Sequence, residues 1–335
     1  MKSRILALTL GCAAVAFGDY AHTVEYSSPG VYEITEVGTD VTLSGQINGN
    51  VDVTLPANCR VTLSGVTLSG VLTINGDAEL MLVGANSVTT DGATAISCSG
   101  TLTIAGTGSL TATSPGAKKA GVISAKNLTL AGGTTTLTIS NPNAKNACGV
   151  SLFGDYTQTD GTLKIVGSSD KYKQNGVFLA KKNTKATIAG GTLDVTLAGE
   201  KSVGLAMDKD TVTGAMTGGT LKFAMSGDGA KGVKGDGSFT MTGGTLEATL
   251  SGGIVEDYFE YEDGDGNTWN YCVTLSSSTK TSGGTSVYNT TSLIANGSYP
   301  VMDPSKCYAV KVGALDISGG TITVSATGTA GRGLG

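Results

Sequence analysis

The sequence is poor in aromatic and charged residues and contains a single histidine. Aromatic residues make up 5% and charged residues 15% of its 335 residues. So few rings suit a narrow interior filled by aliphatic and small side chains rather than a wide globular core. Histidine is the side chain that most often acts as acid or base near neutral pH. The one histidine, His22, stands near the N-terminus, so histidine-based catalysis is not expected.

Arginine and clustered carboxylates are scarce as well. Cleavage of acidic polysaccharides needs paired carboxylates or a basic residue beside the bound uronate. Beyond residue 18 the only arginines are Arg60 and Arg332, and no Asp-Asp or Asn-Thr-Asp cluster occurs. Acidic residues such as Asp208 and Asp236 stand in turn-like contexts. We therefore predict that the protein is not an enzyme, and a polysaccharide lyase is the enzymatic alternative.

No long hydrophobic run occurs beyond residue 18. The segment 1–18 comprises a short basic start, the apolar run 5–17 and small residues suited to cleavage. This pattern is typical of a secretory signal peptide, which is too short to remain as a membrane span. We therefore predict a secreted or cell-surface protein without a transmembrane segment. Export and a net charge of −5 also argue against nucleic acid as a partner.

The sequence is rich in one repeated phrase, a small residue followed by an aliphatic one. The steps between successive copies are 26 to 28 residues, followed by one step of 77. A second phrase, usually Gly-Gly-Thr, recurs once for each of the later copies of the first phrase. The first phrase ends at Ile96, Val122, Val150, Val177, Leu205, Val233 and Val310, and the second at Thr134, Thr162, Thr192, Thr220, Thr245 and Thr321. Periods of this length indicate a repeat architecture.

Between the phrases, aliphatic residues alternate with polar ones, as in the segment 193–197. This is the two-residue period of a β-strand, and no window shows helical spacing. Three short strands and three turns fill about 27 residues, which suits one coil of a solenoid. The fold class predicted is all-β, a right-handed parallel β-helix with coils of about 25–28 residues. A β-sandwich is the alternative, but sandwiches do not repeat one phrase in register.

The β-helix is expected to span residues 19–335 as one domain with an inserted excursion at about 253–308. The insertion accounts for the one long step between copies of the first phrase. At the end of the chain, the segment 331–335 restates the phrase that opens a coil. An uncapped last coil would expose a sheet edge, so we expect that the C-terminus is truncated.

The insertion concentrates rings and carboxylates. Flat aromatic rings can stack on sugars, and clustered carboxylates suit Ca²⁺. The candidate carbohydrate-binding rings are Tyr258, Phe259, Tyr261, Trp269 and Tyr271. The candidate metal ligands are Asp257, Asp263 and Asp265, together with Asp236 outside the insertion. The alternative is a hairpin whose rings merely pack on the rod.

Lysines recur two to five residues before the aliphatic residue that opens a coil. Equivalent positions on neighbouring coils stack about 4.8 Å apart, so these lysines are expected to line one edge and to grip an acidic polysaccharide. They are Lys119, Lys145, Lys173, Lys201, Lys231 and Lys306, of which Lys173, Lys201 and Lys231 are the candidate binding residues. The alternative is that they only solvate and protect an edge.

Five cysteines follow the signal peptide. Their spacing does not suggest zinc. Cys148 and Cys307 each precede a coil-opening phrase, where they would stack as small buried hydrophobic side chains. A disulfide between Cys272 and Cys307 is the alternative in an oxidising compartment.

The repeats also resemble a known family. The segments 232–245 and 303–321 look like the repeating unit of the bacterial "carbohydrate-binding domain-containing" β-helix proteins, and the segments 30–35 and 61–68 resemble their N-terminal lead. The resemblance implies an exported, calcium-associated rod. It also implies binding of plant cell-wall glycans such as polygalacturonate or cellulose. The acidic turn residue of that family is present at Asp236 and is replaced by Lys126 in an earlier coil.

The function predicted is therefore non-catalytic binding of a polysaccharide. A structural surface stalk or adhesin is the second hypothesis, and a polysaccharide lyase is the third.

Overall fold

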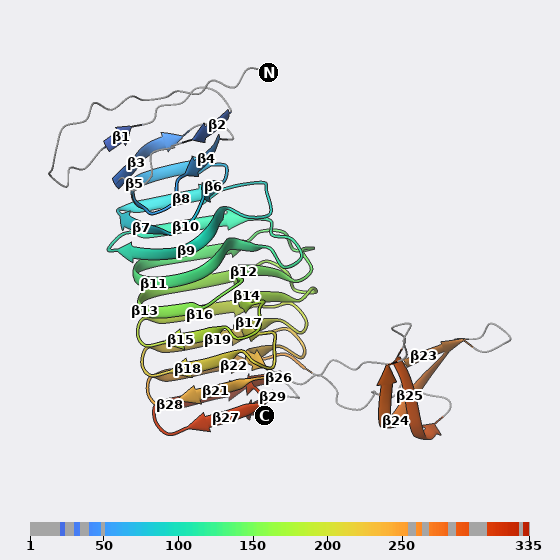
Figure 1. The fold of residues 1–335 in the computed structure, drawn as a ribbon. Helices are drawn as coiled ribbons and strands as arrows, with labels where there is room; N and C mark the ends of the chain where they lie inside the picture. Colours follow the sequence, from blue (N-terminus) through green and yellow to red (C-terminus); the bar gives the residue numbers. More distant parts are fainter. Residues whose placement is uncertain are drawn as a thin grey trace.

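In the computed structural model the chain folds into a stack of parallel β-coils (Figure 1). The backbone is described for residues 21–23, 30–33, 40–47, 51–253, 259–262, 268–280, 286–294, 307–327 and 331–334, and side chains for 40–45, 52–253 and 307–327. These residues confirm the prediction of an all-β parallel solenoid. None of them forms a helix that is long and apolar enough to cross a membrane.

Each complete coil contributes one strand to each of three faces. The first face holds β2 (Gly30–Glu33), β4 (Val51–Leu55), β6 (Leu72–Ile74), the start of β9 (Ile96–Gly106), the start of β11 (Gly121–Ile139), β12 (Ala147–Leu152), β14 (Gln174–Leu179), β17 (Val203–Met207), β20 (Lys231–Gly235), β26 (Cys307–Lys311) and β29 (Gly331–Leu334).

The second and third faces complete the coils. The second face holds β1 (Ala21–Thr23), β3 (Asp40–Ile47), β5 (Cys59–Ser69), β7 (Ala78–Val83), parts of β9 and β11, β13 (Tyr156–Gly167), β15 (Lys185–Ile188), β18 (Thr213–Met216), β21 (Ser238–Met241) and β27 (Ala314–Ile317). The third face holds β8 (Ala85–Thr89), β10 (Ser109–Ser114), β16 (Thr192–Leu197), β19 (Thr220–Met225), β22 (Thr245–Leu250), β28 (Thr321–Ala326) and the ends of β3, β5, β11 and β13.

The aliphatic residues that open the coils form one buried column inside the first face. Val150, Val177, Leu205 and Val233 pair in direct succession, and each is fully buried. One predicted member of this column is wrong. Ile123, not Val122, pairs with both Ile96 and Val150. Both residues are aliphatic and buried, so the phrase alone could not tell which of them holds the register.

The glycines that precede these aliphatic residues make room for the third face. A Cβ atom at Gly176 would meet the side chain of Val195, and one at Gly204 would meet the ring of Phe223. Because protein interiors have few voids, a larger residue would displace these core side chains. The small residue in the repeated phrase therefore allows the interior to stay narrow.

The second repeated phrase marks the corner between the second and third faces. Its threonines pair directly from coil to coil, from Thr134 through Thr162 and Thr192 to Thr321. The residue before each threonine is a glycine with a positive φ, such as 67° at Gly191. Only glycine adopts this conformation without steric cost, which explains why the phrase recurs at every corner.

The first coils are shorter than the repeat predicts. Val53 pairs with Leu72, and Leu72 pairs with Ile96, so both steps along the sequence are smaller than those of the later coils. Leu72 opens the very short strand β6. These coils therefore contain fewer residues, because their strands and turns are shorter.

The inserted segment leaves the path of the coils. Val233 of β20 pairs directly with Val310 of β26, so the register skips the residues between them. Within the insertion, β23 (Phe259–Glu262), β24 (Thr268–Lys280) and β25 (Ser286–Ile294) form a separate antiparallel sheet. At its base, Cys307 Sγ lies 3.5 Å from the carbonyl oxygen of Gly253. The two ends of the excursion are therefore adjacent.

Candidate functional site

The outer surface of the first face is unusually well covered for an exposed sheet. Every residue of β12, β14 and β17 is buried, including those that point away from the core. On the outer side, Cys148, Phe178, Val203 and Ala206 form an apolar cluster distinct from the main core. Neighbouring side chains therefore cover this outer apolar cluster almost completely.

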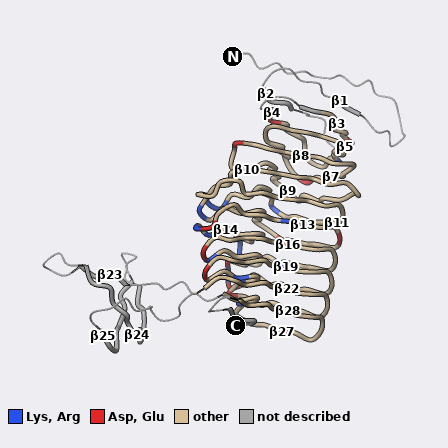
Figure 2. The backbone as a smooth tube through the Cα atoms, turned by 180° about the vertical axis from the view of Figure 1, so that it is seen from behind, with Lys and Arg blue, Asp and Glu red and all other residues tan. Residues whose placement is uncertain are grey.

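Two outward rows change from apolar to basic along the solenoid. In one row, Cys148, Asn175, Val203 and Lys231 occupy paired positions on β12, β14, β17 and β20. In the adjacent row the paired positions are Ser151, Phe178, Ala206, Lys234 and Lys311. Figure 2 shows charged residues gathered on the side of the solenoid that carries β14. The later coils thus place lysines at the positions that the apolar cluster occupies in the earlier coils.

The predicted lysine edge exists in part. One row of paired positions on the first face contains Gly121, Asn175 and Val203. A lysine stands two residues before each of them, namely Lys119, Lys173 and Lys201. Asn146 fills the coil between the first two, and its backbone N–H donates to the carbonyl oxygen of Lys173. The backbones of Lys119, Asn146 and Lys201 are left-handed, with φ of 62°, 56° and 55°. Lys145 lies one residue earlier than this row, and Lys306 lies outside the described residues.

The prediction that Lys231 belongs to the same edge is wrong. Lys231 lies within β20, pairs with Val203 and is 5% exposed. Its Nζ donates to the carbonyl oxygen of Gly229 at 2.6 Å. Burial, together with the neighbouring charge of Lys234, lowers the pKa of Lys231 to about 8. Lys231 therefore belongs to the sheet surface, where its amine loses its proton more readily than an exposed lysine.

Lys173 connects the edge to the sheet surface. Burial is the main cause that lowers its pKa, followed by the charge of Lys234, while Asp208 acts in the opposite direction. Lys173 lines two neighbouring hollows on this face. We name them the Tyr172 hollow and the Val203 hollow, after one residue that lines each.

The Tyr172 hollow lies among the turns. It has a volume of about 540 Å³ including its open mouth, and its lining includes Tyr172, Lys173, Glu200 and Lys201. Lys145 Nζ lies 4.7 Å from the centre of the Tyr172 ring, and Lys171 Nζ lies 5.3 Å from it. These distances fit cation–π contacts. A ring flanked by amines can stack on a sugar while the amines meet an acidic group.

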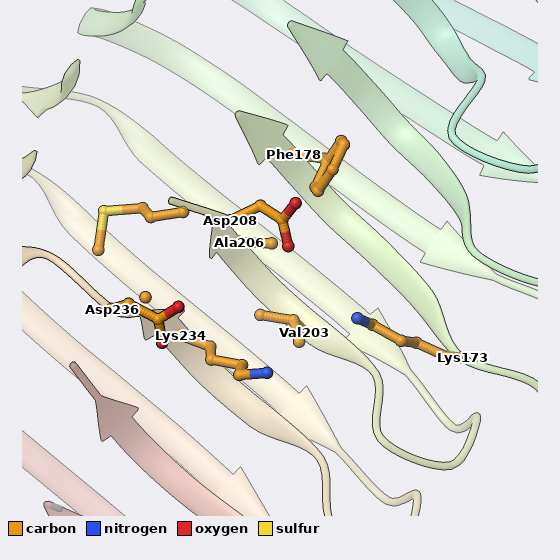
Figure 3. A pocket seen from close by; sticks show the side chains of 9 residues that line it. Lys173, Phe178, Val203, Ala206, Asp208, Lys234 and Asp236 are labelled. Carbon is orange, nitrogen blue, oxygen red and sulfur yellow. The ribbon is translucent and has the colours of Figure 1, made fainter. Parts of the chain in front are cut away.

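The Val203 hollow lies on the sheet surface beside it. Figure 3 shows Lys173 at the right of this hollow, Lys234 and Asp236 next to each other at its lower left, and Asp208 above them. Phe178, Val203 and Ala206 line the space between them. Asp208 and Asp236 follow the paired residues Met207 and Gly235, so they occupy equivalent positions on neighbouring coils.

The ring residues of the insertion fall on two rungs of one ladder. Phe259 pairs with Tyr271, and Tyr261 pairs with Trp269, across β23 and β24. Residues opposite one another in an antiparallel ladder share a face, as do alternate residues of a strand. The four positions therefore lie on one face of the ladder. Tyr258 lies outside the described residues.

The described part of the predicted calcium site is not sufficient to hold the ion. Ca²⁺ takes six to eight oxygen ligands. Asp236 has a carboxylate neighbour at the equivalent position, Asp208, and among the described residues no group of three His, Cys, Asp or Glu side chains could hold a metal ion. Asp257, Asp263 and Asp265 lie outside the described residues, as does the predicted signal peptide 1–18.

The cysteines with described side chains are free and buried. Cys148 lies on the outer surface, where desolvation raises its pKa to about 12. Cys307 lies in the main core, and its thiol contacts the carbonyl oxygens of Gly227 and Gly253 rather than another cysteine. The two do not stack, because Tyr308 rather than Cys307 pairs with the position of Lys231. Both nevertheless behave as small buried side chains.

Comparison with known proteins adds no relative. No family model, no curated protein and no solved structure matches this chain. The resemblance to the carbohydrate-binding β-helix family therefore stays a prediction that rests on the motifs in the sequence.

Sequence reasoning missed several residues of the two hollows. Tyr172 is an isolated ring in a turn, and the only signal for it is that Lys171 and Lys173 flank it. Phe178 and Lys234 directly follow the aliphatic residue that opens a coil, and a spacing argument assigns no role to that position. They become neighbours only because β14, β17 and β20 stack in register.

Proposed function

We propose that this protein is an exported, non-catalytic polysaccharide-binding protein. The glycan lies along the outer surface of the first face and is an acidic chain such as polygalacturonate. The observation that carries the proposal is the Tyr172 hollow, where a ring and several lysines from consecutive coils border one open space of about 540 Å³. Amines on several coils favour an acidic chain over neutral cellulose.

The solenoid geometry supports this proposal. Coils repeat about every 4.8 Å, so lysines at equivalent positions form a row of regularly spaced charges. Lys173 and Lys201 occupy such positions on neighbouring coils. A polymer with a regular series of acidic groups can contact several members of the row at once. Many weak contacts then add to a useful affinity.

The insertion is the second proposed contact. Its two rungs, Phe259 with Tyr271 and Tyr261 with Trp269, bring four aromatic positions to one face of a ladder. Aromatic residues are common in sites that bind small molecules and sugars because they bury much surface with few rotatable bonds. In this proposal the insertion adds affinity for the sugar rings, and the lysines select the acidic chain. Calcium, held by Asp257, Asp263 and Asp265, would assist the insertion.

A glycan array tests the proposal. The full chain is applied with and without a chelator, and polygalacturonate is expected among the bound glycans. In a second step, Tyr172→Ala is compared with Phe153→Ala. Phe153 is 59% exposed and lines neither hollow, so it is a matched control. The Tyr172 variant should lose most of the binding and the Phe153 variant should keep it. Equal binding by the two variants would contradict the proposed site.

The structural stalk is favoured by a different observation. The parallel ladders run without interruption from β12 to β22 on all three faces, which makes a stiff rod. A rod that binds no glycan on the array would favour this function. Release of short products from polygalacturonate would instead favour a lyase.

A further inference from the structure

The third face carries one row of alternating charges on its outer surface. Where β13, β16, β19 and β22 pair in register, the middle outward position is basic, acidic, basic and acidic in turn. These residues are Lys164, Asp194, Lys222 and Glu247, and we name them the charged row. Figure 2 shows β16, β19 and β22 stacked along the solenoid. Neighbouring strands lie about 4.8 Å apart, so the charge changes sign at each step along the rod.

Short side chains surround the charged row. Thr136 of β11 precedes it and Thr323 of β28 follows it in the same register. The outward rows on either side hold Thr162, Thr192, Thr220 and Thr245, and Val166, Thr196, Ala224 and Thr249. The four charged side chains therefore extend beyond the side chains around them.

The charged side chains are open to contact. Lys164, Lys222 and Glu247 are exposed, and Asp194 is half-buried. Opposite charges on neighbouring strands can stabilise a sheet by pairing with one another. In the part of the chain whose side chains are described, however, none of the four takes part in an ion pair. Pairing within one chain therefore does not account for the order of these charges.

The order of the charges is complementary to its own reverse. If a second copy faces the third face and runs antiparallel to it, Lys164 lies opposite Glu247 of that copy, and Asp194 lies opposite its Lys222. A two-fold axis parallel to the strands produces this arrangement and places each outward row opposite itself. In such an interface each of the two pairs occurs twice. The uncharged Thr136 and Thr323 then lie opposite one another at the ends of the row.

The same row disfavours a parallel arrangement. A facing copy that runs in the same direction places every charge opposite its own kind, for example Lys164 opposite Lys164. Like charges that meet across an interface are costly and suppress wrong partners. A shift by one coil would restore opposite charges, but it would remove the two-fold closure of the pair. The charged row therefore specifies both a direction and a register.

The size of the face indicates a weak dimer. Six strands, from β11 to β28, overlap in the antiparallel arrangement, and at ~4.8 Å between strands of about five residues they cover about 450 Å² on each copy. The total of about 900 Å² is below the 1,200–2,000 Å² of stable interfaces and is in the range of transient ones. Association should therefore depend on protein concentration and, because the charges are exposed, on salt.

We propose that the third face binds a second copy of this chain in an antiparallel, two-fold arrangement. The charged row sets the direction and the register, and the rows of short side chains allow the two sheets to approach. The contact leaves the first face of each copy open. The proposal does not depend on the binding of a polysaccharide.

Sedimentation equilibrium with the full chain tests for the dimer. The parent chain is expected to shift from monomer to dimer as its concentration rises, and added salt should favour the monomer. A parent chain that stays monomeric at low salt and at its highest soluble concentration would overturn the proposal.

Two charge variants test the order of the row. Lys222→Asp should weaken dimerisation roughly tenfold or more, because it places two carboxylates opposite one another at both symmetric contacts. Asp194→Lys should have the same effect through two amines. An equimolar mixture of the two variants should dimerise as well as the parent, because each contact between unlike copies again joins opposite charges. Variants that dimerise like the parent, or a mixture that stays monomeric, would overturn the proposal.

Lys185→Asp is the matched control. Lys185 is an exposed lysine of β15 on the second face, so it lies outside the proposed interface. This variant should dimerise like the parent. If it weakens dimerisation as much as Lys222→Asp does, the effect comes from net charge and the third face is not the interface.

A carbodiimide cross-link tests the direction of the second copy, because it joins an amine directly to a carboxylate. Within one chain Lys164 and Glu247 are three strands apart, about 14 Å, which is farther than their side chains can span. A link between these two residues therefore forms only between copies. Mass spectrometry of the cross-linked dimer is expected to find this link, and a dimer without it would overturn the antiparallel arrangement.

Discussion

At the scale of single residues, the corner glycines show most directly how the sequence determines the coil. Gly191 and Gly65 both have left-handed backbones, with φ of 67° and 68°. A Cβ at Gly191 would press on the carbonyl oxygen of Gly161 in the neighbouring coil, whereas one at Gly65 would meet nothing within 4 Å. The two positions therefore separate the cost of backbone strain from the cost of a steric clash between coils.

Alanine substitution at these two glycines tests this distinction. Gly65→Ala should lower the free energy of unfolding by about 1–2 kcal/mol, the usual cost of a left-handed non-glycine residue. Gly191→Ala should lower it by clearly more, because the carbonyl of Gly161 must also move. Denaturant unfolding followed by circular dichroism measures both. Equal losses would show that the neighbouring coil yields without cost.

The lowered pKa of Lys231 should make the free energy of unfolding depend on pH. Its pKa in the folded protein is about 8, against 10.5 for an unperturbed lysine. The unfolded chain then binds this proton more tightly, so the free energy of unfolding should rise with pH between about 8 and 10.5. Lys231→Met should lose this part of the rise. Unfolding curves of both proteins across this range give the difference, and parallel pH profiles would contradict the burial of a charged amine.

The limits of prediction at this scale come from register. Ile123, not Val122, lies in the inner column. The spacing of the phrases could not distinguish these two adjacent aliphatic residues. Lys231 stands two residues before Val233, whereas Lys173 and Lys201 stand four residues before Val177 and Leu205. This small offset decides whether a lysine lies in the turn or in the strand. Only the paired strands reveal that difference.

At the scale of strands, the inward column of the first face is the main structural element. Val177 is fully buried and pairs with Val150 and Leu205. Val177→Asp should lower the free energy of unfolding by about 3 kcal/mol or more, because it buries a charge without a partner. Thr196→Asp, on the exposed side of β16, is the control and should change it little. Thermal unfolding of both variants would check this, and similar melting temperatures would place Val177 outside the core.

The alternation of aliphatic and polar residues predicted the strands of the regular coils well. The corner glycine, which recurs in each of these coils, marked where the strands turn. The alternation did not predict the short coils near the N-terminus. Leu72 opens a coil without the Gly-Gly-Thr phrase, and that coil is shorter than the regular ones that follow it. The Val203 hollow was also not predictable, since it combines side chains from β14, β17 and β20 with residues of the adjoining turns.

At the scale of the whole molecule, the solenoid and the insertion are expected to fold independently. Gly253 and Cys307 meet at the base of the insertion, with the Cys307 thiol 3.5 Å from the Gly253 carbonyl oxygen. A short glycine linker in place of residues 254–306 should therefore leave the melting temperature of the solenoid nearly unchanged. The same deletion should weaken the binding of glycans and of calcium. A large loss of stability would show that the insertion supports the coils.

The arrangement of charge over the whole molecule underlies the central claim that the lysine-rich side of the first face binds an acidic glycan. The most direct measurement is the affinity for polygalacturonate as a function of salt. It compares the parent chain with the double variant Lys173→Glu, Lys201→Glu. The parent's affinity should fall steeply with salt, because exposed charges are screened over about 8 Å at physiological ionic strength.

The double variant should bind weakly at low salt while its melting temperature stays close to that of the parent, because lysines near the surface contribute little to folding. Neutral cellulose oligomers should show no salt dependence with either protein. A double variant that binds polygalacturonate at low salt as well as the parent does would contradict the claim, and the lysines would then serve only to keep this side of the rod in solution.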